Sequence, residues 1–362
     1  MVSLQKERVE SIKFMRVVAM LLVVLIHTTG IGIRELTPDN PFYFLYLFLN
    51  RFTRFEGAVF VFLSGFVLFY NYESRPYTVK TWTTFYKKRF MYILGPFLVW
   101  SIFYQLFSFY MGTRKYIGIG PMIENIATGQ SYYQLYFILI LVQLYFLLPV
   151  FIYFIQKFHW FKKYLLLIGF IIELGVQVLF KKYNITFALP LFTGYLASFF
   201  FGGWVAMYYP KLKKEWSRGL MAGATIFTVA LGILYMLLYY QFHILDNPSI
   251  PYAPFKILAM IYYLSACFIL FKWSIILEKY GSIRFNEWAE RLRVYSFGYY
   301  LVHPFILELA KLVFVPQTLF QFHLFIFIRY IVVVIGCYVF IRVIHILLPR
   351  AWMIFGKLPS WK

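Results

Sequence analysis

The chain has 362 residues, of which 62% are hydrophobic and only 14% are charged, and its mean hydropathy is +0.71. Soluble globular domains average about 45–50% apolar and about 25% charged residues, so the composition excludes that class. The net charge of +21 does not indicate nucleic-acid binding, because the basic residues lie in short connections between apolar stretches, where lysine and arginine set membrane orientation.

Apolar stretches near 20 residues recur along the chain, and each is long enough to cross about 30 Å of hydrocarbon. They predict an all-α, polytopic membrane bundle that occupies residues 1–362 as a single domain. The first stretch is too long for a signal-peptide core and lacks a small-residue cleavage pattern, so we expect it to remain as a helix. About ten spans are predicted, at residues 12–33, 55–73, 90–111, 132–156, 161–180, 187–209, 219–241, 254–277, 293–315 and 324–348.

The connections between these spans alternate in their content of lysine and arginine. The two termini and the connections on the same side carry 23 of the 35 basic residues, and the connections on the other side carry eight. Cytoplasmic loops are enriched in Lys and Arg. The asymmetry therefore predicts that both termini are cytoplasmic, which requires an even number of spans.

Two ionisable residues, Arg16 and His27, lie in the first predicted span. Eleven residues at about 100° each bring His27 to within about 20° of Arg16, about 16 Å further along the helix. Both side chains are therefore expected to line one slot, with Arg16 near the cytoplasm and His27 deeper. An arginine there can hold a phosphate or a carbonyl, and a neutral imidazole can remove a proton from a hydroxyl. The alternative is that Arg16 reaches the headgroups while His27 bonds a neighbouring helix.

The second predicted span contains a run with two small residues, Ser64 and Gly65, within the segment Phe-Leu-Ser-Gly-Phe at 62–66. Small residues in a membrane helix allow a ligand or a second backbone to approach closely. Ser64 is therefore a candidate substrate-binding residue. Taken alone, the segment favours the alternative, which is helix packing.

The third predicted span begins with a basic cluster in which Lys88 and Arg89 come last, and Pro96 follows inside the span. The positive charges suit the phosphates of coenzyme A, whose adenosine part cannot enter lipid. The alternative is that the cluster only sets the orientation of the span. Proline inside a membrane helix often bends it and requires local re-pairing of backbone groups.

The ninth predicted span places His303 near the middle of the membrane, directly before a proline. Ionisable residues at that depth are costly and often mark a site. The alternative is a core histidine bonded to a tyrosine or a carbonyl. No histidine has a Cys, His or carboxylate at metal-ligand spacing, so we expect no metal site. Cys267 and Cys337 lie in apolar runs and are expected to pack as small hydrophobic residues.

These segments occur in the same order in membrane acyltransferase family 3, which the chain resembles over nearly its whole length. The segments that carry the resemblance are Arg16-x10-His27, Phe-Leu-Ser-Gly-Phe at 62–66, Lys88-Arg89 with Pro96, Tyr-Gln-Leu-Tyr-Phe at 133–137 and Ser296 through Pro304.

The resemblance implies an O-acyltransferase of the bacterial plasma membrane. Its donor would be cytoplasmic acyl-CoA, as acetyl-CoA or succinyl-CoA, with no permanently bound cofactor. Its acceptor would be a hydroxyl of a cell-envelope polysaccharide or a lipid-linked glycan. By position, His27 is implied as the catalytic histidine, with Arg16 as a catalytic and donor-binding arginine, and Lys88 and Arg89 as further donor-binding residues. We expect Ser64 and His303 to contact substrate.

The chain departs from the family pattern at the start of the third span. Many members have Arg-x-x-Arg there, whereas this chain has Arg89 followed by Tyr92 in the second place. That resembles the branch containing the intercellular-adhesin polysaccharide O-succinyltransferases. The departure leaves both the donor's contacts and the choice between acetyl and succinyl open.

Two other functions fit a helical membrane protein with buried charges. A polysaccharide exporter or flippase is the first, although the chain has no detectable inverted repeat and no paired broken helices. A non-enzymatic membrane scaffold, in which Arg16 and His27 are structural, is the second.

Overall fold

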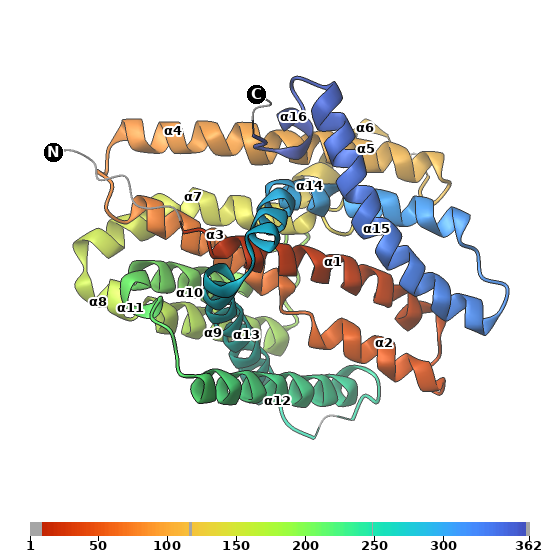
Figure 1. Ribbon diagram of the computed structural model, residues 1–362, viewed down its shortest axis with the longest axis horizontal. Helices are drawn as coiled ribbons and strands as arrows, with labels where there is room; N and C mark the ends of the chain where they lie inside the picture. The colour runs from red at the N-terminus through yellow and green to blue at the C-terminus, as the bar shows by residue number, and fades with distance from the viewer. Residues whose placement is uncertain (1–8, 116–117, 248, 360–362) are drawn as a thin grey trace.

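A computed structural model describes residues 9–115, 118–247 and 249–359. Within these ranges the chain is helical and contains no strand, which confirms the predicted all-α class. Figure 1 shows α1 in the middle of the bundle, with α4 and α5 along one edge and α12 along the opposite edge. The larger helices are α1 (Ile12–Glu35), α2 (Pro41–Phe52), α3 (Glu56–Tyr72), α4 (Val79–Arg89), α5 (Gly95–Tyr110), α6 (Ile119–Thr128), α7 (Tyr136–Lys157), α9 (Leu165–Tyr183), α10 (Leu196–Met207), α12 (Arg218–His243), α13 (Tyr252–Tyr280), α14 (Ile283–Val313) and α15 (Leu319–Leu347).

Short helical turns complete the described structure. They are the π-helix η1 (Phe90–Leu94), α8 (His159–Lys163), the 3₁₀ turn η2 (Phe192–Tyr195), α11 (Tyr209–Leu212) and α16 (Trp352–Phe355).

Seven helical stretches among the described residues are long and apolar enough to cross a membrane. They are Ile12–Glu35, Pro41–Tyr72, Val79–Tyr110, Tyr136–Lys157, Arg218–His243, Tyr252–Tyr280 and Leu319–Leu347. The other three expected spans coincide with α9, α10 and α14. Of these, α9 carries Glu173, Lys181 and Lys182, α10 has only 12 residues, and α14 begins ten residues before the expected span, in a polar stretch.

The helices pack into two apolar groups that meet at α1. One group joins α3, α7, α10 and α13, and the other joins α5, α14 and α15. Helix α1 contributes residues to both groups and contacts α2, α3, α13, α14 and α15. Cys267 and Cys337 are buried and unbridged, one in each group, as expected of small packing residues. The central position of α1 places its side chains between the two halves of the bundle.

Glycines bring α3 and α10 into close contact. A Cβ atom on Gly65 would lie 2.1 Å from the carbonyl oxygen of Phe199, and a Cβ atom on Gly202 would lie 2.0 Å from that of Phe62. Only glycine lets the two backbones approach so closely. Helix packing therefore explains Gly65, while the neighbouring Ser64 points elsewhere.

Pro96 explains the change of helix type at the start of the third expected span. Proline has no backbone N–H and its ring excludes the carbonyl of the preceding turn. The chain responds with the π-helix η1, in which the N–H of Gly95 donates to the carbonyl of Phe90. The α4, η1 and α5 segments thus form a nearly continuous 32-residue helix, Val79–Tyr110, with a locally wide turn.

Pro304 lies inside α14, which continues through it as an α-helix, and a tyrosine hydroxyl supports the backbone at this point. The hydroxyl of Tyr104 donates to the carbonyl of Leu301 at 2.6 Å and accepts from the N–H of Phe305 at 3.2 Å. The hydroxyl is thus inserted where an ordinary helix has a direct backbone bond between these two residues. This insertion fixes the turn of α14 that carries His303.

Candidate functional site

Helix α1 directs Arg16 and His27 toward two neighbouring cavities. Arg16 lies in the second turn of α1 and lines a cavity of about 190 Å³, which we call the Arg16 cavity. His27 lines a second cavity of about 180 Å³, the His27 cavity. The single slot expected from the sequence is therefore divided in the structure.

The Arg16 cavity combines basic and hydroxyl side chains with an apolar wall. The Nε atom of Arg16 is buried and has no hydrogen-bond partner among the described residues. The Ser64 hydroxyl donates to the hydroxyl of Tyr145 at 3.1 Å. The cavity is lined by Arg16, Phe60, Leu63, Ser64, Val67, Leu68, Arg89, Ile93, Phe137, Ile138, Leu141, Tyr145, Ser296, Phe297 and Tyr300.

Of the basic pair expected at this site, only Arg89 lines the cavity. Its guanidinium lies 5.1 Å from the ring centres of both Phe85 and Tyr145, and its Nε atom is buried. Lys88 is exposed and is not among the lining residues, because the next position of a helix faces another direction. Tyr92 also turns away, and its ring packs 5.7 Å from that of Trp352.

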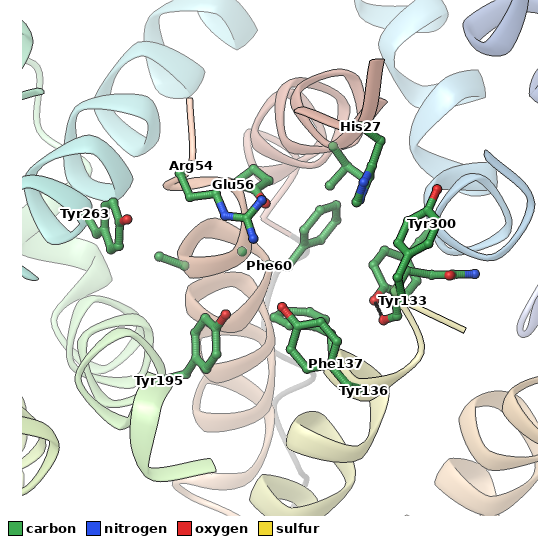
Figure 2. Close-up of a pocket in the computed structure, with 14 residues that line it drawn as sticks. His27, Arg54, Glu56, Phe60, Tyr133, Tyr136, Phe137, Tyr195, Tyr263 and Tyr300 are labelled. Carbon is green, nitrogen blue, oxygen red and sulfur yellow. Dashed lines mark hydrogen bonds between the residues drawn. The ribbon is translucent and has the colours of Figure 1, made fainter. Parts of the chain in front are cut away.

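The His27 cavity is mainly aromatic and contains one pair of opposite charges. Figure 2 shows His27, Arg54 and Glu56 around one space, with the rings of Tyr133, Tyr195 and Tyr300 nearby. The cavity is lined by Val23, His27, Arg54, Glu56, Gly57, Ala58, Phe60, Tyr133, Gln134, Tyr136, Phe137, Tyr195, Tyr263 and Tyr300.

His27 and His303 lie against each other, although they are far apart in the sequence. Their ring centres are 5.0 Å apart in a stacked arrangement, and the ring of Tyr133 is 4.7 Å from that of His27. His303 is buried, and its Nδ1 is 3.0 Å from the carbonyl of Tyr299. Because a carbonyl can only accept, Nδ1 carries a proton, and Nε2 is buried with no partner among the described residues.

A break between α2 and α3 brings Arg54 and Glu56 into the His27 cavity. Helix α2 ends at Phe52 and α3 begins at Glu56. The carboxylate of Glu56 interacts with backbone N–H groups of the first turn of α3, where the helix dipole favours negative charge. The guanidinium of Arg54 is close enough for the two charges to attract. The sequence marks Glu56 only as an ionisable residue at the edge of a span, so its place beside His27 is a structural finding.

Glu173 is a second buried carboxylate, and its contacts hold helices together. Its Oε2 accepts from the backbone N–H of Ala197 at 3.0 Å, and its Oε1 lies 3.6 Å from the amino group of Lys256. These contacts join α9, α10 and α13. Both oxygens of Glu173 therefore have partners, whereas Oε2 of Glu56 is buried and has none among the described residues.

A third and larger cavity, of about 570 Å³, is also lined by His27, and we call it the vestibule. It shares His27, Arg54 and Tyr133 with the His27 cavity. The vestibule is lined by His27, Arg34, Arg54, Phe107, Ser108, Met111, Thr113, Arg114, Tyr132, Tyr133, Leu307, Glu308 and Lys311. Four cationic side chains and one carboxylate, that of Glu308, line the vestibule. The carboxylate of Glu308 pairs with the amino group of Lys311 at 2.8 Å.

Three aromatic rings separate the Arg16 cavity from the His27 cavity. Phe60, Phe137 and Tyr300 line both cavities, and their ring centres are 5.9–6.5 Å apart. The Tyr300 hydroxyl donates to the backbone carbonyl of Gln134. We call these three residues the aromatic partition. They allow the two cavities to hold different chemical groups within one bundle.

Comparison with known proteins shows which family the chain belongs to. A family model described as an acyltransferase domain matches residues 9–342. Two proteins named probable poly-β-1,6-N-acetyl-D-glucosamine export protein, from Staphylococcus aureus strains Mu50 and MRSA252, are each 22% identical to it over 316 residues, which cover 84% of both chains. The protein of that name from strain MSSA476 is 21% identical over the same length. No solved structure matches the chain. The chain therefore belongs to this acyltransferase family.

Proposed function

We propose that this acyltransferase moves an acyl group from cytoplasmic acyl-CoA to a hydroxyl of a cell-envelope polysaccharide or of a lipid-linked glycan. The observation that carries the proposal is the placement of Arg16 and His27 on one helix, on opposite sides of a thin aromatic partition. A transferase needs a place for an anionic donor and a place for the attacking hydroxyl, and these must be adjacent.

The Arg16 cavity is the proposed donor site. Arg16 and Arg89 face it with buried Nε atoms, and guanidinium groups suit phosphate and carbonyl oxygens. Arg16 lies near the N-terminal end of α1. The distribution of Lys and Arg predicts that this end faces the cytoplasm. Acyl-CoA would approach from that side, with its thioester passing between the rings of the aromatic partition so that its carbonyl carbon meets the acceptor hydroxyl beside His27.

His27 is the proposed general base. It takes the proton from the acceptor hydroxyl while the hydroxyl oxygen attacks the carbonyl carbon of the thioester. The carbon–sulfur bond then breaks, and the departing thiolate of coenzyme A takes the proton from His27. The stacked ring of His303 holds the His27 imidazole in place. An acyl-enzyme formed on His27 is the alternative route for the same overall reaction.

A second candidate function is polysaccharide export, which the names of the related Staphylococcus aureus proteins favour. The two functions differ in the chemistry of the polymer. Loss of an exporter would leave polymer stranded inside the cell, whereas loss of an acyltransferase would leave exported polymer without ester groups. Mass spectrometry of envelope glycans from cells with and without the protein separates them.

The direct test uses purified protein in proteoliposomes, radiolabelled acetyl-CoA or succinyl-CoA, and an oligosaccharide of β-1,6-linked N-acetylglucosamine as the test acceptor. Wild-type protein is expected to produce labelled, base-labile ester on the oligosaccharide. His27→Ala is expected to abolish that product, and His159→Ala, which changes an exposed histidine on α8, is the matched control. Wild-type ester formation by the His27 variant would refute the proposed role.

A further inference from the structure

The His27 cavity contains polar groups that the proposed proton transfer does not use. Gln134 is only 3% exposed, and both its Nε2 and its Oε1 are buried without a partner among the described residues. Oε2 of Glu56 is buried and equally unpartnered within the same described ranges. Buried polar groups in native proteins nearly always have partners, so such groups in a cavity indicate a ligand.

These two side chains are held in place by their surroundings. Gln134 lies in the turn before α7, where the Tyr300 hydroxyl donates to its backbone carbonyl and the next residue, Leu135, is fully buried. Glu56 is anchored at the first turn of α3. The backbone of each residue is thus fixed, and both residues line the cavity. Such groups bind a ligand with little loss of conformational entropy.

The chemistry of the His27 cavity suits an uncharged polyol. The charges of Arg54 and Glu56 offset each other, and the rest of the wall is largely tyrosine and phenylalanine. A carboxylate accepts hydrogen bonds from hydroxyl groups, and a carboxamide both donates and accepts. The volume of about 180 Å³ corresponds to about six water molecules at ~30 Å³ each, which is room for one sugar ring and not for a longer oligosaccharide.

The other two cavities are less suited to a neutral sugar. The Arg16 cavity has two guanidinium groups and no carboxylate among its lining residues. The vestibule has four cationic side chains and one carboxylate. Only the His27 cavity, of the three, combines balanced charge with unpartnered hydrogen-bonding groups.

We infer that Glu56 and Gln134 form the acceptor subsite, in which they hold one uncharged sugar unit so that a single hydroxyl faces His27. Glu56 accepts a hydrogen bond from a neighbouring hydroxyl of that unit. The carboxamide of Gln134 bonds a second substituent, either a hydroxyl or an acetamido group. The inference rests on the proposed function and deepens it, because it assigns the residues that select which hydroxyl is acylated.

The test measures acceptor and donor kinetics separately in Glu56→Gln, Gln134→Leu and the control Glu124→Gln, which changes an exposed carboxylate on α6. Glu56→Gln replaces a charged hydrogen-bond acceptor by a weaker neutral one, and Gln134→Leu removes the carboxamide. We expect the KM for the oligosaccharide acceptor to rise about tenfold in each, while the affinity for acyl-CoA stays at the wild-type level. The control is expected to match wild type throughout.

Deoxy analogues of the acceptor identify the contact. Wild-type protein is expected to discriminate against the analogue that lacks the hydroxyl bound by Glu56, and Glu56→Gln is expected to lose most of that discrimination at that one ring position. Gln134→Leu carries no change of charge, so it remains informative if Glu56→Gln fails to fold beside Arg54, and folding is checked by thermal unfolding in detergent.

The inference is overturned if both folded variants keep the wild-type KM for the acceptor, or if they lose acyl-CoA binding in parallel with transfer. The proposed function fails in a different way: wild-type protein would then form no ester from acyl-CoA at all.

Discussion

The Arg16 cavity and the His27 cavity are nearly equal in volume, at about 190 and 180 Å³, but they differ in lining. The first has two guanidinium groups, two serines and a wall of aliphatic and aromatic side chains. The second has tyrosines, a carboxylate offset by an arginine, and a carboxamide without a partner among the described residues. The difference fits the proposal that the two cavities receive an anionic donor and an uncharged acceptor, with α1 lining both and three aromatic rings between them.

The largest effect is expected at His27, because it acts on the chemical step. General base catalysis contributes about 10²–10⁴ in rate, so His27→Ala is expected to lower kcat by at least about 100-fold. Coenzyme A binding, measured by calorimetry on the detergent-purified protein, is expected to stay unchanged because His27 lies beyond the aromatic partition. Loss of coenzyme A binding in this variant would show that the two cavities are not functionally separate.

The next largest effect is expected on the other side of the partition. Hydrogen bonds to charged groups contribute about 1.5–3 kcal/mol, so Arg16→Gln and Arg89→Gln are each expected to weaken acyl-CoA binding by about 10–100-fold. Lys88→Gln is the matched control, since Lys88 is exposed and does not line the cavity. An equal loss in the Lys88 and Arg89 variants would mean that the donor binds at the surface cluster as a whole.

A smaller, opposite effect is expected when the aromatic partition is opened. Phe60→Ala removes one of the three rings that would close around the thioester, which gives water access to it. Acceptor-independent hydrolysis of acyl-CoA is therefore expected to rise several-fold while coupled transfer falls. Phe103→Ala is the control, because Phe103 packs on α5 beside Trp100 and lines none of the three cavities. Unchanged hydrolysis in the Phe60 variant would show that these rings do not shield the thioester from water.

The smallest effect is expected at Ser64, and its neighbour provides the contrast. Ser64→Ala loses one neutral hydrogen bond, worth about 0.5–1.5 kcal/mol, and is expected to weaken donor binding only a few-fold. Gly65→Ala would place a Cβ atom 2.1 Å from the Phe199 carbonyl oxygen and is expected to destabilise the fold by about 1–3 kcal/mol. Thermal unfolding distinguishes the two, and equal melting temperatures would contradict the close packing of α3 on α10.

Much of the fold could be predicted from the sequence, because hydropathy and helical periodicity are local properties. The all-helical class and the placement of a helix over each expected span follow from them. The number of spans does not, since α10 is short and α14 continues a polar segment into an apolar one. The pairing of Arg16 and His27 on one face also follows from helix geometry, whereas the rings that divide their slot come from three other segments.

The candidate site was predictable only where its residues are unusual for a membrane. His27, His303 and Arg16 stand out because ionisable groups are rare there, and the structure brings the two histidine rings together. Gln134 gives no such signal, since an uncharged residue in a turn becomes informative only when tertiary packing leaves it buried and unpartnered. Lys88 shows the opposite limit. The sequence reveals the basic cluster, but the rotation of the helix decides which of its side chains face the cavity, and Lys88 is exposed.

The most direct test of this account is a structure of the protein with coenzyme A and the acceptor oligosaccharide bound together. We predict the phosphates of coenzyme A against Arg16 and Arg89 and one sugar ring between His27 and Glu56, with the thiol of coenzyme A directed past Phe60 toward a hydroxyl of that ring. Density for both ligands on the same side of Phe60, or coenzyme A beside His27 with the Arg16 cavity unfilled, would contradict the division of the site into a donor half and an acceptor half.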